Sequence, residues 1–328
     1  MTHVSNNSNL TVSVVMCTYN GESFIHQQIT SIVSQTYPVK ELLIFDDAST
    51  DKTVKVITEI VLKYPFIKLV INKKNVGFTK NFEQAIKAAS GDVIAISDQD
   101  DIWINTKIEK MIKAWKKESP LIYCNSFVFS HTPPENPRPP KFRQFKGTDA
   151  RKIYLFNTVS GHAILIKKQF VPLVIPFEEG TMYDWWMAVV AAYNGGVQHH
   201  DEVLVYHRTH SKNITVNSLD KFTKAEQRFL HQKLLIKQFK KFSTAPNIPP
   251  SHKDFLIKYC RLMEESLSKQ FYLPLFLFLL KNRCILLNNK KRKIGILSNI
   301  KHSYLQTFHS KNIEQTLSEK FAIYNIKK

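Results

Sequence analysis

The chain has 328 residues, of which 43% are hydrophobic and 12% aromatic, and its 46 lysines and arginines outnumber its 27 aspartates and glutamates, so that the formal net charge is +19. This apolar content is enough for a packed core and excludes a wholly disordered chain. Nine glycines exclude a collagen-like or glycine-rich low-complexity sequence. The four cysteines form no CxxC pair, which argues against a disulfide scaffold or structural zinc site and fits a reducing compartment.

The positive charge is concentrated in the last third of the chain. Residues 1–210 carry 23 basic and 20 acidic side chains, whereas residues 211–328 carry 23 basic and 7 acidic ones. The basic region is either an ordinary lysine-rich, solvated surface or a surface that attracts an anionic partner. Such a partner could be a membrane, a nucleic acid or a phosphorylated substrate.

Hydrophobic periodicity predicts alternating strands and helices over the first 130 residues. Short apolar runs rich in β-branched side chains indicate buried strands at residues 12–17, 42–45, 67–71, 93–96 and 121–124. Apolar positions at helical spacing indicate helices at residues 25–33, 54–64, 82–89 and 108–115. This alternation is typical of an α/β fold with a mostly parallel sheet that is covered on both faces.

The second half of the chain changes from mixed to helical patterns. The proline-rich stretch 133–140 is predicted to be a surface loop. Strands at 163–166 and 203–206 follow, with a helix at 185–193 that the Gly195-Gly196 pair is expected to end. Amphipathic helices are predicted around 219–234 and 255–267. We therefore expect an α/β domain at residues 1–215 and a basic, helical region at residues 216–328.

The sequence shows neither a targeting signal nor a membrane span. The N-terminal ten residues are polar, and the longest apolar run, residues 271–280, contains a proline. A spanning helix needs about 20 apolar residues. The chain is therefore expected to be cytoplasmic, either soluble or peripheral on the inner face of the cell membrane.

Polar segments follow three of the predicted strands, at residues 18–22 (TYNGE), 46–51 (DDASTD) and 97–101 (SDQDD). One Asp-Asp pair after a strand is more often a helix cap than a site. The carboxyl ends of parallel strands, however, lie at one edge of the sheet, where ligands bind in open α/β folds. Three such ends on one edge therefore predict a binding site.

The chain contains neither GxGxxG nor GxxxxGK[ST], which argues against a Rossmann dehydrogenase and a P-loop NTPase. Phosphates would have to be neutralised in another way. Asp98 and Asp100, two residues apart after a buried strand, can reach the same pocket, and hard oxygen ligands suit Mg²⁺ or Mn²⁺. Such an ion would bridge a diphosphate and stabilise it as a leaving group.

In this order, the segments resemble the family 2 glycosyltransferases, which have the GT-A fold. The matching motifs are VSVVMCTYNGESF, SIVSQTYP, ELLIFDDASTDKT, NVGFTKNFEQAI and GDVIAISDQDDIW. Within the family, the chain is most similar to bacterial enzymes labelled rhamnosyltransferase-like. The resemblance covers residues 11 to 215 and implies a catalytic domain that binds a nucleotide-diphosphate sugar, UDP- or dTDP-linked, with Mn²⁺ or Mg²⁺. It does not extend to the helical region.

The resemblance also implies roles on the donor side. The loop after the first strand packs on the nucleotide base, Asp47 reads the base or ribose, and Asp101 caps a helix or orients its neighbours. Asp100 holds the metal most directly, and His210, in the sequence Arg208-x-His210-x-x-Asn213, touches the metal or the diphosphate unless it is an ordinary surface histidine. The implied nucleotide-sugar contacts are Thr18, Tyr19, Asn20, Glu22, Asp47, Gly77, Lys80, Asn81, Asp98 and Gln99, and the implied metal ligands are Asp98, Asp100 and His210.

On the acceptor side, the resemblance implies that Asp184 is the catalytic base, in the sequence Tyr183-Asp184-Trp185-Trp186. Tyr183 departs from the family pattern of Glu-Asp or His-Asp, and the alternative is a helix cap at Asp184 followed by two core tryptophans. A helix N-terminus would keep the carboxylate ionised. It would accept the proton of the acceptor hydroxyl in one displacement that inverts the configuration. The implied acceptor-side residues are Gly161, His162, Trp185 and Trp186.

The family's processive members carry a Gln-x-x-Arg-Trp sequence, which is absent here, so transfer of a single sugar is expected. The resemblance implies an acceptor among lipopolysaccharide, capsule or similar cell-surface glycans and glycolipids. The apolar run 271–280 and the basic residues that follow it resemble an interfacial anchor on an anionic membrane, or form a buried helix with a basic face. The alternatives are a nucleotidyltransferase and a non-enzymatic polyanion binder. Nucleic acid is not an expected partner, because the carboxylates would repel phosphates.

Overall fold

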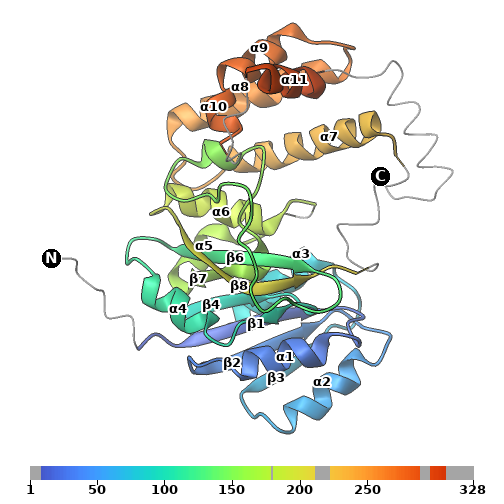
Figure 1. Ribbon diagram of the computed structural model, residues 1–328, viewed down its shortest axis with the longest axis vertical. Coiled ribbons are helices and arrows are strands. Elements are labelled where there is room, and N and C mark those ends of the chain that lie inside the picture. The colour runs from blue at the N-terminus through green and yellow to red at the C-terminus, as the bar shows by residue number, and fades with distance from the viewer. Residues whose placement is uncertain (1–8, 179, 211–221, 289–295, 308–328) are drawn as a thin grey trace. The chain divides into compact units, whose positions relative to one another are not determined.

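The computed structural model describes residues 9–178, 180–210, 222–288 and 296–307 (Figure 1). The chain divides into two compact units. The first unit comprises residues 1–150 and 157–210, and the second comprises residues 151–156 and 211–328.

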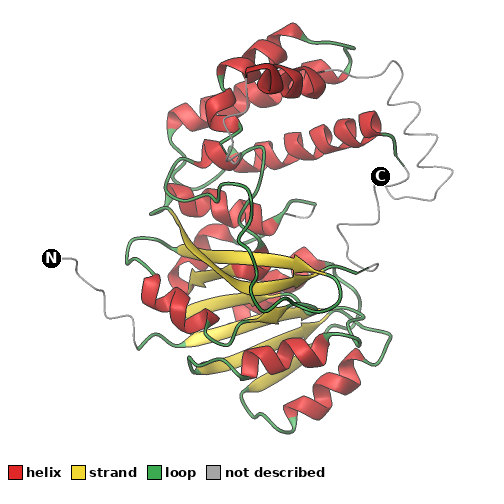
Figure 2. Cartoon of the chain, viewed as in Figure 1, coloured by secondary structure: helices red, strands yellow, loops and turns green. Residues whose placement is uncertain are grey.

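The first unit contains one sheet, whose strands are yellow in Figure 2. Its eight strands lie in the order β3-β2-β1-β4-β7-β6-β8-β5. The strands β1, β2, β3 and β4 pair in parallel, whereas β7 pairs antiparallel with both β4 and β6. The strands are β1 (Val12–Thr18), β2 (Val39–Asp46), β3 (Ile67–Ile71), β4 (Val93–Ser97), β5 (Ile102–Trp103), β6 (Leu121–Phe129), β7 (Ile164–Lys167) and β8 (Val197–Arg208). The mostly parallel α/β sheet predicted from the periodicity is confirmed.

Helices cover both faces of this sheet (Figure 2). Val12, Val14 and Met16 of β1 share a buried cluster with apolar side chains of α1, α2 and α4. Successive side chains of a strand point to opposite faces, so Val15 faces the other side, where α3 packs on β1 and β2. The helices of this unit are α1 (Ile25–Val33), α2 (Thr53–Val61), α3 (Phe78–Ala88), α4 (Lys107–Ala114), α5 (Val171–Val174) and α6 (Tyr183–Tyr193).

The second unit is helical among its described residues. Tyr154 packs against the rings of Phe239, Phe242 and Phe255, with ring centroids 5.8, 5.9 and 6.1 Å away. The segment 151–156 therefore groups with the C-terminal helices, although it lies inside the α/β domain predicted at 1–215. The helices are α7 (Lys224–Phe242), α8 (Pro250–Leu267), α9 (Leu273–Lys281), α10 (Arg283–Leu286) and α11 (Ile296–Thr307).

Two local features match the sequence pattern directly. Gly195 and Gly196 follow α6 with φ angles of +115° and +93°, so the predicted glycine termination of this helix is confirmed. Thr223 and Glu226 form a capping box at the start of α7, which stabilises a helix by satisfying two of its free N–H groups. Leu219, which we assigned to this helix, lies outside the described residues.

None of the helices in the described parts of the chain is long and apolar enough to cross a bilayer. All four cysteines lie among the described residues, and all four are free thiols.

Gly195 provides a test of the packing between the turn after α6 and the loop before β6. An added Cβ would lie 2.2 Å from the carbonyl oxygen of Glu118, in a backbone conformation that side chains rarely adopt. We expect Gly195→Ala to lower the free energy of unfolding by roughly 3 kcal/mol. Gly147→Ala, which has a φ of +100° and open space around the new Cβ, should cost only about 1 kcal/mol.

Urea denaturation followed by tryptophan fluorescence measures both variants, because all four tryptophans belong to the first unit. Equal losses for the two substitutions would show that the chain relieves the contact at Glu118 and would contradict the prediction.

Candidate active site

The three polar segments predicted to form one edge lie after β2, β1 and β4, which are neighbours in the sheet. Thr18 connects the first two, because its hydroxyl donates to Asp46 at 2.8 Å and its carbonyl accepts from the Asp47 amide at 2.8 Å. Gln99 connects the first and third: the Tyr19 amide donates to its Oε1 at 3.0 Å, and its Nε2 donates to the Tyr19 carbonyl at 3.1 Å. The strand ends therefore form one bonded rim.

Several residues that we assigned to nucleotide contacts use their side chains to hold this rim together. The buried carboxylate of Asp47 accepts from the amides of Val76 and Gly77 at 2.8 and 2.9 Å. Asn20, with a left-handed φ of +49°, accepts from the Thr50 amide at 2.8 Å. Glu22 likewise accepts from the Lys52 amide at 2.9 Å. These side chains position the loops.

The remaining donor-side assignments fall into buried and exposed sets. Asn81 is buried and donates to the Phe45 carbonyl at 2.8 Å. Lys80 is exposed and pairs with Glu83 at 3.1 Å. Tyr19 is 46% exposed, so its ring is available to a ligand at this rim.

The turn after β4 concentrates negative charge. Asp98 is partly exposed, whereas Asp100 is buried and lies with its Oδ2 2.8 Å from Nε2 of His210. Burial, together with the charges of Asp101 and Asp98, raises the pKa of Asp100 to about 6 against the opposing effect of His210. Phe24 stacks on the His210 ring with centroids 4.6 Å apart. The structure thus brings together Asp100 and His210, two of the three residues in the predicted ligand set.

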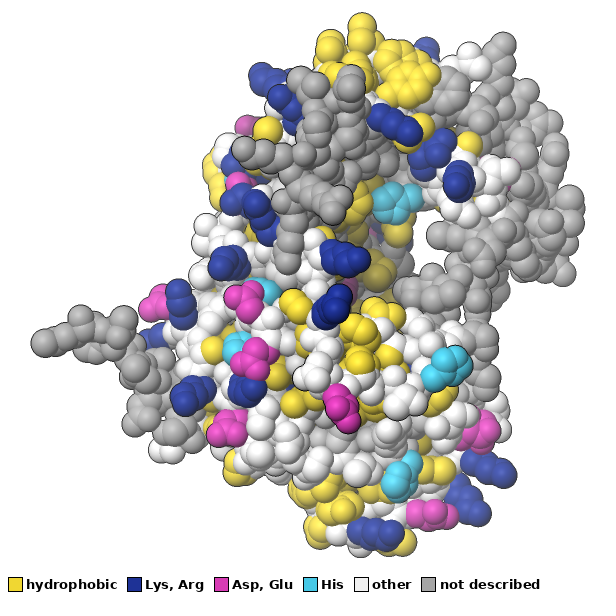
Figure 3. Space-filling view, in the orientation of Figure 1, with side chains coloured by type: hydrophobic (Ala, Val, Ile, Leu, Met, Phe, Trp, Pro, Cys, Tyr) yellow, Lys and Arg dark blue, Asp and Glu magenta, His cyan; other side chains and the backbone are white. Residues whose placement is uncertain are grey.

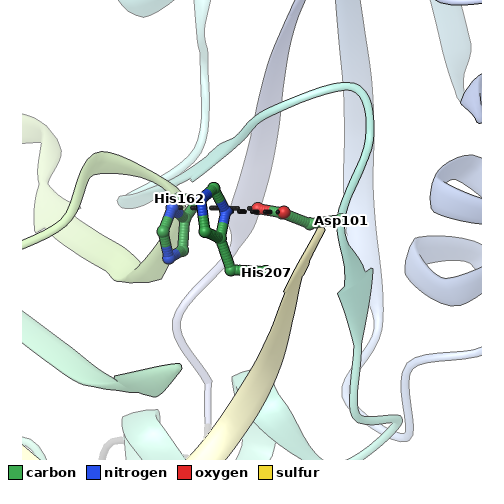
Figure 4. Close-up of side chains that lie close together, drawn as sticks. All are labelled: Asp101, His162 and His207. Carbon is green, nitrogen blue, oxygen red and sulfur yellow. Dashed lines mark hydrogen bonds and ion pairs between the residues drawn. The ribbon is translucent and has the colours of Figure 1, made fainter. Parts of the chain in front are cut away.

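The third carboxylate, Asp101, is completely buried and lies beside two histidines (Figure 4). His207 Nδ1 is 2.9 Å from Asp101 Oδ1, and the Arg208 amide donates to the same oxygen at 3.1 Å. His162 Nδ1 lies 3.7 Å from Asp98 and 3.8 Å from Asp101. His162 therefore stands between two of the three carboxylates.

The residue types of Asp101, His162 and His207 are those of a metal site, with one ligand atom of each within 4.8 Å of the others. Their present geometry favours an ion pair. The two imidazoles are stacked, with centroids 4.5 Å apart and planes within 8° of parallel, so an ion in the plane of one ring would lie outside the plane of the other. Burial opposes protonation of His207, but its hydrogen bond to Asp101 and the carboxylate charge outweigh this and raise its pKa to about 9.

Two basic residues that we did not assign to the site donate hydrogen bonds to backbone carbonyls within it. The Arg208 guanidinium donates to the Asp100 carbonyl at 2.9 Å and lies over the rings of Phe24 and Phe129. Lys107 is completely buried, and its ammonium donates to the His162 carbonyl at 2.9 Å. Arg208 belonged to a recognised motif, but Lys107 gave no sequence signal beyond its place beside the apolar face of a helix.

Asp184 lies in the first turn of α6 and accepts hydrogen bonds from the Gly161 amide at 3.2 Å and the Trp185 amide at 2.7 Å. Met182 occupies the N-cap, so the alternative of a cap at Asp184 is wrong. The carboxylate is nevertheless harder to ionise than a position at a helix N-terminus would suggest. Desolvation raises the pKa of Asp184 to about 6, because it outweighs the two amide hydrogen bonds that favour the charged form.

The other acceptor-side assignments are largely buried. Trp185 and Trp186 are 6% and 4% exposed, and the Trp186 indole donates to the Val174 carbonyl at 2.8 Å. Gly161 packs closely against Tyr183, since an added Cβ would lie 2.5 Å from the Tyr183 hydroxyl. Asn213 lies outside the described residues.

Known proteins are similar to this chain in sequence. The model of the family "Glycosyl transferase family 2" matches residues 13–171. A glucosyltransferase of Escherichia coli, WfgD, is 30% identical over 187 residues, which cover 55% of this chain and 69% of that protein. The chain belongs to glycosyl transferase family 2. The dTDP-rhamnosyl transferase RfbG of Shigella flexneri is 41% identical over 35% of this chain and 39% of its own.

Other relatives and solved structures extend the comparison. The match to an uncharacterised glycosyltransferase of Haemophilus influenzae, 35% identical, spans only 36% of that protein. TarS of S. aureus, residues 1–349, superposes with a TM-score of 0.59 at 17% identity over 95% of this chain and 92% of that chain. A mannosyltransferase of Pyrobaculum calidifontis superposes with a TM-score of 0.54 at 16% identity over 99% of this chain and 84% of its own. These superpositions show that the fold is shared.

The Asp101–His207 ion pair makes stability depend on pH. In the folded protein the pKa of His207 is about 9, above the value near 6.5 of an unperturbed histidine. The stabilisation is therefore complete below pH 6.5 and is lost as the pH rises through 9. We expect the contribution of this ion pair to the free energy of unfolding to fall by about 2 kcal/mol between pH 7 and pH 9. In the wild type the fall is partly offset by Lys107, because burial lowers its pKa to about 8 and the folded state gains stability as this lysine loses its proton.

Urea titrations at several pH values measure this slope. His207→Gln should abolish most of it, whereas His26→Gln, at an exposed position of α1, should retain it. A slope that is unchanged in His207→Gln would refute the assignment of the ion pair.

Proposed function

We propose that the protein is an inverting, metal-dependent, non-processive glycosyltransferase that moves one sugar from a nucleotide-diphosphate sugar to a hydroxyl of a cell-surface glycan or glycolipid. The observation that carries the proposal is the turn at Gly161 and His162. The Gly161 amide binds Asp184, and the next side chain, His162, lies between Asp98 and Asp101. A candidate base and the acidic donor-side turn are therefore held by two consecutive residues.

On the donor side, the residues present fit a divalent cation. Asp100 is buried beside two further carboxylates; burial raises its pKa, and the neighbouring negative charges add to this effect. Carboxylate oxygens with one imidazole nitrogen form a donor set that suits Mn²⁺ or Mg²⁺. Asp98, Asp100 and His210 would hold the ion, which when bound would supply positive charge to the diphosphate leaving group.

The relatives support the choice of donor. The names of WfgD and RfbG refer to UDP-glucose and to dTDP-rhamnosyl transfer. TarS was solved with UDP-GlcNAc, and the Pyrobaculum calidifontis enzyme was solved with GDP-Man and Mn²⁺. We take a UDP- or dTDP-linked sugar as the donor, with the exposed ring of Tyr19 packing on the base.

On the acceptor side, Asp184 acts as the base. With a pKa of about 6 it is ionised at neutral pH and remains basic enough to accept a proton from a hydroxyl group. The two backbone amides that bind it fix the direction of its oxygens. The hydroxyl oxygen then attacks the anomeric carbon from the side opposite the nucleotide, while the bond from this carbon to the diphosphate oxygen breaks and the nucleoside diphosphate leaves. This displacement inverts the configuration.

The acceptor is proposed to be carried on a lipid at the inner face of the cell membrane. The name of WfgD specifies a GlcNAc-diphosphoundecaprenol acceptor, which is a sugar on a lipid diphosphate. The basic second unit is consistent with an anionic membrane as a partner.

Substitution of Asp100 tests the donor side. Asp100→Ala should weaken binding of the sugar nucleotide in the presence of Mn²⁺ by at least about tenfold, because it removes the buried carboxylate of the ligand set. Isothermal titration with UDP- and dTDP-sugars, with and without Mn²⁺, measures the effect. Glu59→Ala, at an exposed position of α2, is the control. Equal affinity of Asp100→Ala and wild type in both conditions would exclude this ligand set.

Substitution of Asp184 tests the base. Asp184→Asn should leave donor affinity unchanged and lower kcat by roughly 10²–10⁴-fold. Wild-type kcat, at saturating donor and metal, should fall about tenfold per pH unit below pH 6 and level off above it, since the base must be ionised. Retained turnover in Asp184→Asn would place the base elsewhere.

A further inference from the structure

Helix α9 of the second unit is apolar on both its inward and its outward side. Leu275 and Leu279 are 1% and 3% exposed, and Phe278 packs on the rings of α8. On the other side Leu273 and Leu277, four residues apart, are 52% and 54% exposed. A helix on a water-facing surface normally carries polar residues there. Lys281, the last residue, is the only charged residue of α9.

The apolar surface continues from α9 to α11. Phe271, which is 40% exposed, contacts the ring of Tyr304 with centroids 5.7 Å apart. Ile300 and Tyr304, also four residues apart, are 37% and 45% exposed. We define the α9–α11 patch as Phe271, Leu273, Leu277, Ile300 and Tyr304. Figure 3 shows hydrophobic side chains gathered over the region of α9, with Lys and Arg side chains beside them.

The charges around the α9–α11 patch are positive. Lys281 and Lys301 are exposed at the end of α9 and on α11. The two acidic residues that precede the patch in sequence have basic partners: Glu264 pairs with Lys240 at 2.6 Å, and Glu265 pairs with Arg261 at 3.8 Å. Lys290, Lys291, Arg292 and Lys293 follow in the sequence but lie outside the described residues.

We propose that the α9–α11 patch docks on a bilayer surface rich in anionic lipids. Exposed leucine and aromatic side chains would enter the boundary between headgroups and acyl chains, while the lysines would contact lipid phosphates. With nine residues, α9 is about 14 Å long, less than half of the ~30 Å hydrocarbon thickness, so it lies on the membrane and does not cross it.

Charge favours a membrane over a second copy of this chain as the occupant. A symmetric contact between two copies would place the same patch against itself and bring Lys281 and Lys301 of both copies close together. An anionic surface removes this repulsion. The role of this docking rests on the proposed function, because docking would bring the active site to a lipid-linked acceptor.

Vesicle binding by the full-length protein tests the inference. The wild type should co-sediment with vesicles of phosphatidylcholine and phosphatidylglycerol (7:3) and not with phosphatidylcholine alone. Leu273→Gln/Leu277→Gln should lower the partition coefficient by about tenfold or more, because the apolar contacts are lost while helix propensity is kept. Lys281→Gln and Lys301→Gln should each lower it about fivefold at low salt.

The matched controls are Leu62→Gln, at an 82% exposed position of the first unit, and Lys55→Gln on α2, which should both bind like the wild type. Equal binding of wild type and Leu273→Gln/Leu277→Gln would overturn the proposal. So would light scattering that shows an oligomer dissociated by this double substitution, with no vesicle binding, since the patch would then be a contact between copies.

Membrane docking and the proposed function can be tested separately. Donor affinity and transfer to a soluble acceptor analogue should be the same in Leu273→Gln/Leu277→Gln and wild type. Loss of vesicle binding with activity retained therefore supports the inference, and vesicle binding by an inactive protein would count against the proposed function alone.

Discussion

The candidate site depends on the compensation of one buried charge, that of Asp101. This carboxylate is shielded from water and receives its hydrogen bonds from His207 and from the amide of Arg208 at the end of β8. A buried carboxylate without such partners would be strongly unfavourable. The same arginine holds the Asp100 carbonyl. The acidic turn after β4 can therefore adopt its conformation only when β8 is in place beside it.

This dependence links two distant parts of the chain. The turn that carries Asp98 and Asp100 follows β4 in the middle of the sheet, whereas His207, Arg208 and His210 come from the end of β8 or just beyond it. Because each carboxylate has a basic or N–H partner, the carboxylates can lie close together without their repulsion forcing the loops apart. The result is a compact cluster of carboxylates, in which Asp100 and Asp101 are buried and Asp98 is partly exposed.

In the donor-side rim, some side chains hold the loops in place and others are exposed to a ligand. Asp47, Asn20 and Gln99 were assigned to the nucleotide, yet their polar atoms are engaged by backbone groups of the neighbouring loops. They would shape the pocket through the backbone that they hold. Tyr19, with a largely exposed ring, is better placed for direct contact. The second unit shows the reverse arrangement, in which side chains of α9 that would normally be buried face outward.

Local pattern was sufficient for most of the fold. The strands at 12–17, 67–71 and 93–96, the helix at 25–33 and the glycine stop after α6 follow from residue type and period, because each depends on neighbours within one element. The length of β8 was not predictable. Its first half includes the stretch QHHDE, which carries no apolar alternation, and this half becomes a strand because Val197–His200 pair with β6. The two-residue strand β5 likewise exists only through its pairing with β8.

The same distinction applies to the site. The sequence placed Asp98, Asp100 and Asp184 beside the relevant strand and helix ends, since those positions are local. It did not indicate that His162 and His207 would stack beside Asp101, or that burial would raise the pKa of Asp184 instead of leaving it low. Desolvation and charge pairing depend on which residues meet across long separations in the chain, and these meetings exist only once the sheet has assembled.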